Sequence, residues 1–256
     1  MLQVDLNADM GESFGAWTMG DDASLLKTVT SANIACGGHA GDPDVLAATL
    51  RMAAQNNVGI GAHPGFMDIL GFGRNRMTVP RGTLQNMIRY QVAACVGMAR
   101  SVNAKVRHLK LHGALSNMSS EDEQLATDCY EAALSVDPDL IVMVLAATAQ
   151  QDAVQKLGCA WAGEIFADRA YNDDATLVDR SKDGAVIHDP DIAGARIVQM
   201  VKAGAIITDN GRHIKTHIDT ICLHGDTPTA VQIARSVRTA LEDADVEVKT
   251  FSGRTG

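Results

Sequence analysis

The stretch Ser31-Ala-Asn-Ile-Ala-Cys-Gly-Gly-His-Ala-Gly-Asp-Pro43 contains every part of one strand–helix unit. The apolar run Ser31–Cys36 predicts a buried strand, and the two glycines that follow let the backbone turn sharply. Asp42-Pro43 then caps and opens a helix. His39 lies in the turn, where it either faces solvent or faces a site that the glycines let a ligand approach.

The same pattern recurs along the chain, so a parallel α/β sheet is expected. Helical periodicity follows Asp42-Pro43, Pro80, Ser120 and Thr227-Pro228. Seven strands of this kind build either a closed barrel or an open doubly wound sheet, and the pattern alone does not separate the two. The apolar, β-rich runs are Leu2–Leu6, Ser31–Cys36, Val58–Ala62, Val106–Leu111, Leu140–Leu145, Cys159–Phe166 and Thr220–Leu223.

Two further features define the organisation. Residues 204–218 break the alternation, and Asp209-Asn-Gly between two β-rich runs predicts an added hairpin. The chain has no linker, low-complexity tract or block of charge, so we expect one domain over residues 1–256.

Composition excludes several classes of partner. A net charge of −9 and a pI near 5.3 argue against nucleic acid and against an anionic membrane surface. No apolar run approaches the roughly 20 residues that span a bilayer. The five cysteines are scattered and form no CxxC pair, so we expect reduced thiols and a cytoplasmic protein. The sequence leaves open whether the chain forms a homo-oligomer.

Polar residues collect where the predicted strands end. Four of the eight histidines lie at such positions, each followed by Ala, Pro or Gly. The carboxyl ends of parallel strands meet on one face, so these side chains are expected to line one pocket. The residues expected there are Asn7, Asp9, Glu12, His39, His63, His112, Asp168 and His224, with Lys110, Arg169 and Asp226 beside them.

Two kinds of chemistry suit this set. Neutral histidines with carboxylates are divalent-metal ligands, and Asp9, His39 and His63 form a candidate trio, although no HxxxH or HExxH spacing is present. General acid–base catalysis is the interpretation we favour. Arg74, in Gly71-Phe-Gly-Arg-Asn-Arg76, either binds an anion or belongs to a solvated basic loop. No P-loop occurs.

Long motifs resemble the LamB/YcsF family, in the family's order and from Asp5 to about Val231. They are DLNADMGESFG, SANIACGGHAGDP, GAHPGFMDILGFGR, KLHGAL, EIFADRAY, LVDRSKDGAVI and ICLHGDTPTAV. The resemblance implies a seven-stranded β/α barrel related to carbohydrate deacetylases. It also implies the role of the A subunit of a 5-oxoprolinase, which opens the lactam of 5-oxo-L-proline to L-glutamate while ATP becomes ADP and phosphate. Two partner subunits, B and C, are implied as well.

The chain departs from the family pattern at Met67, Asn75, Leu111, Ser116 and Asp179. These departures leave the loop around Arg74 and the shape of the substrate pocket less defined. For the implied reaction, Lys110, Arg74 and Arg169 are candidates to carry phosphate charge. Asp9, His39, His112 and Asp168 are the catalytic candidates. The remaining residues, Asn7, Glu12, His63, His224 and Asp226, are candidates to bind the lactam or a metal.

Two other functions stay open. One is a metal-dependent amidohydrolase or deacetylase that needs no ATP. The other is a non-catalytic subunit that binds the lactam while its partners perform the chemistry.

Overall fold

A computed structural model describes residues 2–223 and 229–255. Seven parallel strands close into a barrel in the order β1-β2-β3-β4-β5-β6-β9, and β9 pairs with β1 to complete the ring. Of the two sheets that the sequence pattern allowed, the closed barrel is therefore the correct one. The strands are β1 (Leu2–Met10), β2 (Ser31–Ala35), β3 (Gly59–His63), β4 (Val106–Lys110), β5 (Ile141–Leu145), β6 (Trp161–Phe166) and β9 (Thr220–Leu223).

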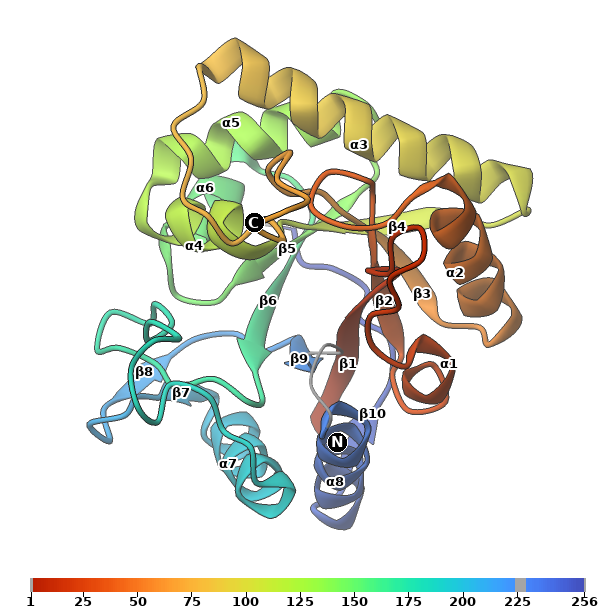
Figure 1. Ribbon diagram of the computed structural model, residues 1–256. Helices are drawn as coiled ribbons and strands as arrows, with labels where there is room; N and C mark the ends of the chain where they lie inside the picture. Colours follow the sequence, from red (N-terminus) through yellow and green to blue (C-terminus); the bar gives the residue numbers. More distant parts are fainter. Residues whose placement is uncertain (1, 224–228, 256) are drawn as a thin grey trace.

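Helices cover the outside of the barrel (Figure 1). Side-chain caps fix the first turn of several of them. Asp42 accepts hydrogen bonds from the amides of Asp44 and Val45, as its place before Pro43 predicts. The helices are α1 (Asp22–Leu25), α2 (Pro43–Gln55), α3 (Arg81–Ser101), α4 (Gly113–Glu121), α5 (Glu123–Leu134), α6 (Ala149–Leu157), α7 (Pro190–Ala203) and α8 (Ala230–Asp243).

One predicted helix start is wrong. The sequence placed a start at Ser120, but Ser120 belongs to α4, and α5 begins after Asp122, whose carboxylate caps it. The start expected at Thr227-Pro228 lies outside the described residues.

The predicted hairpin is present. Strands β7 (Ala205–Ile207) and β8 (His213–Lys215) pair antiparallel around Asp209-Asn-Gly, and they lie beside α7 at the edge of the molecule (Figure 1). A short strand not predicted from the sequence, β10 (Val246–Val248), pairs in parallel with the start of β1. Within the described ranges, no helix combines the length and the apolar character needed to cross a membrane.

Strand β1 is longer than predicted, and this places the first site residues. The expected strand stopped at Leu6, whereas β1 continues to Met10, so Asn7 and Asp9 lie on the strand itself. Side chains alternate between the faces of a strand. Leu6, Ala8 and Met10 pack outward in the apolar core under the helices, while Asp5, Asn7 and Asp9 point into the barrel.

Candidate active site

A cavity of about 500 Å³ opens at the carboxyl ends of the barrel strands. Its walls come from the ends of β1, β3, β4 and β6, from α4, and from the loops that follow β3 and β6. Sequence-predicted residues that line it are Asp9, Glu12, His63, Arg74, Lys110, His112 and Arg169.

The other predicted residues lie elsewhere. His39 is fully buried and packs on His112, with ring centroids 3.5 Å apart and an interplanar angle of 2°. Asn7 lies deeper, inside the barrel. Asp168 is buried beside Arg169 but does not line the cavity. His224 and Asp226 lie outside the described residues.

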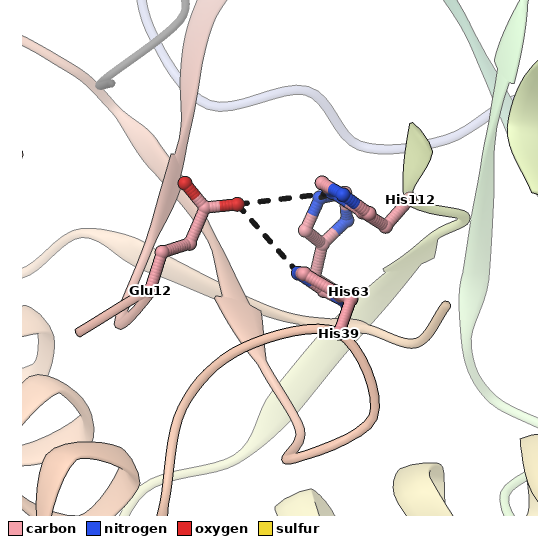
Figure 2. A group of neighbouring side chains, drawn as sticks. All are labelled: Glu12, His39, His63 and His112. Carbon is pink, nitrogen blue, oxygen red and sulfur yellow. Dashed lines mark hydrogen bonds and ion pairs between the residues drawn. The ribbon is translucent and has the colours of Figure 1, made fainter. Parts of the chain in front are cut away.

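Three histidines and one glutamate form a compact cluster, shown in Figure 2. We call Glu12, His39, His63 and His112 the histidine cluster. Glu12 Oε1 lies 3.6 Å from His39 Nε2 and 3.7 Å from His112 Nδ1. His112 Nδ1 lies 3.0 Å from His63 Nε2. One ligand atom from each of the four residues falls within 4.8 Å of the others.

The hydrogen bonds of two rings define where their lone pairs point. His63 Nδ1 is 2.8 Å from the Lys110 carbonyl, and His112 Nε2 is 2.9 Å from the Phe72 carbonyl. A carbonyl only accepts, so both of these nitrogens carry hydrogen. In neutral rings the lone pairs of His63 Nε2 and His112 Nδ1 then face each other across 3.0 Å. A proton or a metal cation between them resolves the repulsion.

This arrangement fits a divalent metal. Three imidazoles and one carboxylate form a ligand set that zinc and similar ions accept. The candidate trio changes accordingly, since the geometry favours Glu12 and His112 with His39 and His63, while Asp9 pairs with Lys110. Burial, with the neighbouring histidines, lowers the pKa of His39 and of His112 well below the ordinary value, so both rings are neutral near pH 7, as metal ligands must be.

Below the cluster, Lys110 is held between two carboxylates. Its Nζ lies 2.9 Å from Asp9 Oδ1, 2.9 Å from Glu164 Oε1 and 3.0 Å from Cys222 Sγ. Asn7 donates to the same Glu164 oxygen over 3.0 Å. Burial alone would lower the pKa of Lys110, but Asp9 foremost and Glu164 outweigh it and raise that pKa well above its usual value. The interior therefore holds a permanent ammonium at the floor of the cavity.

Asp9 connects the lysine to the histidines. Its Oδ1 accepts from Lys110 and from Asn33 Nδ2 at 2.9 Å, and its Oδ2 lies 3.3 Å from His63 Nε2. Asp9 Oδ1 accepts two hydrogen bonds and Oδ2 lies next to His63 Nε2, so a proton taken up by that nitrogen would be shared with the carboxylate.

Glu164 and Asn33 belong to this network, and the sequence interpretation missed both. Glu164 stands in the middle of an apolar strand, Trp161–Phe166, and carries no glycine or turn signal after it. Its one sequence signal is a carboxylate inside a buried run, a position that carboxylates almost never occupy without a partner. Asn33, in β2, gave a similar signal.

Glycines let the loop after β3 approach the histidine cluster. Gly73 has φ +61°, and a Cβ there would lie 2.6 Å from His39 Cβ and 2.8 Å from His112 Cδ2. The neighbouring Phe72 supplies the carbonyl that holds His112. His39 is therefore covered by this loop and faces Glu12 in the histidine cluster, not solvent, which answers the question raised by the turn after Cys36.

The fold and the site together define a class: a parallel β/α-barrel protein with a histidine- and carboxylate-lined cavity at the carboxyl ends of its strands. Residues 4–256 match the model of one family. The chain belongs to the LamB/YcsF family.

Individual relatives agree with this assignment. A Ruegeria pomeroyi protein, named as the A subunit of 5-oxoprolinase, is 67% identical over 251 residues, which cover 98% of this chain and 99% of that protein. The crystal structure of a lactam utilization protein from Thermus thermophilus is 38% identical, with a TM-score of 0.91, over 98% of this chain and 100% of that one. A family 4 carbohydrate esterase from Streptomyces lividans, 11% identical, shares the fold alone, with a TM-score of 0.52 over 99% and 96% of the two chains.

Proposed function

We propose that this chain is the ring-opening A subunit of a cytoplasmic ATP-dependent 5-oxoprolinase that works with two partner subunits, B and C. The relative from Ruegeria pomeroyi, through its name, supports the substrate and the complex. The observation that carries the chemistry is the juxtaposition, in one cavity, of the buried Lys110–Asp9 pair with the histidine cluster.

The proposed reaction consumes one lactam, one ATP and two waters, and it yields glutamate, ADP and phosphate. A five-membered lactam is a resonance-stabilised amide, so water attacks its carbonyl slowly. Phosphorylation of the carbonyl oxygen activates the carbon. The first water adds to that carbon, the ring C–N bond breaks with its electron pair and a proton going to nitrogen, and an acyl phosphate forms. The second water releases phosphate.

The residues have matching roles. Lys110 offsets negative charge that develops at the reacting carbon and its oxygens, and Arg74 and Arg169 line the same cavity. Asp9 Oδ2 and His63 Nε2, 3.3 Å apart, with His112 Nδ1 3.0 Å further, provide a short path along which the proton of the attacking water can move. His39 packs on the His112 ring and keeps it in that plane.

The test is reconstitution. The purified chain alone, the two partners alone and all three together are supplied with 5-oxoproline and ATP, and glutamate and ADP are followed at the same time. We expect negligible turnover by any subset and coupled release of the two products by the complete mixture. Full coupled turnover by the isolated chain would contradict the need for partners.

The histidine cluster favours a second candidate, a metal-dependent amidohydrolase. Glu12, His39, His63 and His112 would hold the ion, and the ion would supply Lewis-acid activation of the carbonyl. This candidate predicts glutamate release without ATP and its loss on treatment with a chelator. Strict dependence on ATP with indifference to the chelator would rule it out.

A further inference from the structure

Gln91 is a buried polar residue that lies outside the cavity, on the buried face of α3. Its neighbours on that face of the helix are apolar, among them Ile88, Val92 and Cys95. An amide that is fully removed from water is stable only when its polar atoms are paired. The partners of this amide therefore identify the segment that it holds.

The side chain of Gln91 pairs with both the N–H and the C=O of one residue in the turn after β3. Gln91 Oε1 accepts from the Gly65 amide at 3.0 Å, and Gln91 Nε2 donates to the Gly65 carbonyl at 2.8 Å. Nε2 also donates to the Met87 carbonyl of its own helix at 3.2 Å. Two hydrogen bonds to one residue fix both its distance and its orientation, so Gln91 ties the turn to α3.

The segment His63-Pro64-Gly65 reaches every histidine of the histidine cluster. It carries His63, and the Pro64 carbonyl accepts from the backbone amide of His112 at 2.9 Å. A Cβ on Gly65 would lie 2.9 Å from His39 Nδ1, so the backbone of this residue lies directly against the His39 ring. The position of the segment therefore sets the spacing of all three imidazoles.

Gln91 also lies against the turn that carries His39. A Cβ on Gly38 would lie 2.2 Å from Gln91 Oε1, closer than two such atoms can approach. Within the part of the chain that the structure describes, neither ring nitrogen of His39 makes a hydrogen bond. The position of this ring therefore depends on how the two turns pack around it, and Gln91 contacts both turns.

We propose that Gln91 is a positioning residue for ring opening, because it fixes the turn after β3 and thereby the spacing of the three histidines in the cluster. The inference rests on the proposed function, which places ring opening at these histidines. Gln91 does not line the cavity, so it acts only through them. A change at Gln91 should therefore lower kcat and leave the KM for 5-oxoproline nearly unchanged.

The test variant is Gln91→Met, because methionine has a similar length and fills an apolar site but cannot make the two hydrogen bonds to Gly65. The matched control is Gln150→Met. Gln150, on α6, is also buried and also bonds to backbone groups, since it accepts from the Leu145 amide at 2.8 Å and donates to the Ser116 carbonyl at 2.7 Å. Among the described contacts, none of its hydrogen bonds reaches the turns of the histidine cluster.

The first measurement is made on the isolated chain by nuclear magnetic resonance. It follows the imidazole N–H signals of His63 and His112, whose protons are held by the Lys110 and Phe72 carbonyls. We expect both signals to shift, or to exchange with solvent, in Gln91→Met. Gln150→Met should lose melting temperature to a similar extent and keep both signals.

The second measurement is kcat and KM for glutamate formation by the reconstituted subunits. We expect Gln91→Met to lower kcat by about 10- to 100-fold, because a small displacement of a catalytic group costs up to about 100-fold, and to change KM by less than about twofold. If Gln91→Met fails to fold, Gln91→Asn replaces it. Asparagine keeps a buried amide but is one methylene shorter, so it cannot make both bonds to Gly65.

Several outcomes would overturn the inference. Full turnover by a folded Gln91→Met or Gln91→Asn complex would do so, as would unchanged imidazole signals, because a loss of turnover would then not pass through the histidines. Loss of the same signals in Gln150→Met would show that they respond to any broken buried amide. Altered signals in Gln91→Met, with no turnover of 5-oxoproline even by the unmodified complex, would refute the proposed function and leave Gln91 as the residue that positions the cluster.

Discussion

At the scale of single residues, Asp5 shows what the polar interior costs. Its carboxylate is fully buried in the barrel and accepts from Thr30 Oγ1 at 2.6 Å, from Ser31 Oγ at 2.7 Å and from the Thr220 hydroxyl. Burial raises the pKa of Asp5 to about 6, although these hydroxyls act to lower it. Folding therefore disfavours the charged form of this residue.

We predict that Asp5 makes the protein less stable as pH rises from about 4 to about 6. In that window the folded state keeps a proton that the unfolded state has released, so the free energy of unfolding falls as the pH rises. Above about pH 6 it stays at the lower value. A pKa displacement of this size corresponds to about 3 kcal/mol. Urea unfolding of the unmodified chain and of Asp5→Asn at pH 4.5 and 7.5 measures the larger part of this loss, and the variant should show a smaller difference in unfolding free energy between the two pH values.

The control for this measurement is Asp183→Asn, an exposed carboxylate in the loop after β6, which should retain the full difference between the two pH values. If Asp5→Asn loses as much stability between pH 4.5 and 7.5 as the control does, another group is responsible.

Single residues also show how far the sequence could be interpreted. His63 and His112 were predicted because each ends a strand beside a glycine or proline, a pattern visible in the chain itself. The pairing of Lys110 with Glu164 was not predicted, because it joins β4 to β6, and the sequence does not show that both strands border β5, which brings the two groups within 2.9 Å. The fold also places Asp9 beside Lys110 and Glu12 beside the three histidines.

At the scale of elements, the loop between β3 and α3 supports the histidine cluster. Its glycines let the backbone lie directly against His39 and His112, and the amide of Ala114 donates to the Gly73 carbonyl, which ties the loop to α4. A side chain at Gly73 would have to displace one of the rings.

We predict that Gly73→Ala disturbs both stability and activity. The left-handed φ of +61° costs an L-residue about 1 kcal/mol, and the added Cβ would lie 2.6 Å from His39 Cβ. Gly158→Ala is the matched control, because Gly158 has φ +64° with nothing within 4 Å of an added Cβ. We expect Gly158→Ala to lose about 1 kcal/mol of unfolding free energy and to keep its full turnover rate. We expect Gly73→Ala to lose clearly more unfolding free energy and to lose turnover as well. Equal losses would show that the loop does not press on the histidines.

Strands and helices differ in how well the sequence predicts them. The hairpin β7–β8 was predicted because Asp209-Asn-Gly has local turn chemistry. The end of β1 was misplaced because Asn7 and Asp9 look like loop residues, and only the polar barrel interior makes them strand residues. The start of α5 was misplaced because both Ser120 and Asp122 are good caps.

At the scale of the whole molecule, barrel closure creates the site. The pairing of β9 with β1 completes the ring, and it brings residues from β1, β3, β4 and β6 to one cavity. The sequence pattern could not choose between a closed and an open sheet, because closure depends on long-range pairing and not on local periodicity. The family resemblance made that choice, and the structure confirms it.

The central claim is that ring opening takes place at the histidine cluster. His112 is buried, with only 4% of the residue exposed, so alanine would leave a cavity, whereas His112→Asn keeps a polar group near the position of Nδ1. The measurement is the rate of glutamate formation by the reconstituted complex that contains this variant, with the melting temperature and the assembly of the variant as controls. We predict that the rate falls by about 100-fold or more while folding and assembly persist, because a proton-transfer group contributes about that much. Turnover at the unmodified rate by a folded, assembled His112→Asn complex would contradict the claim and assign the chemistry to the partner subunits.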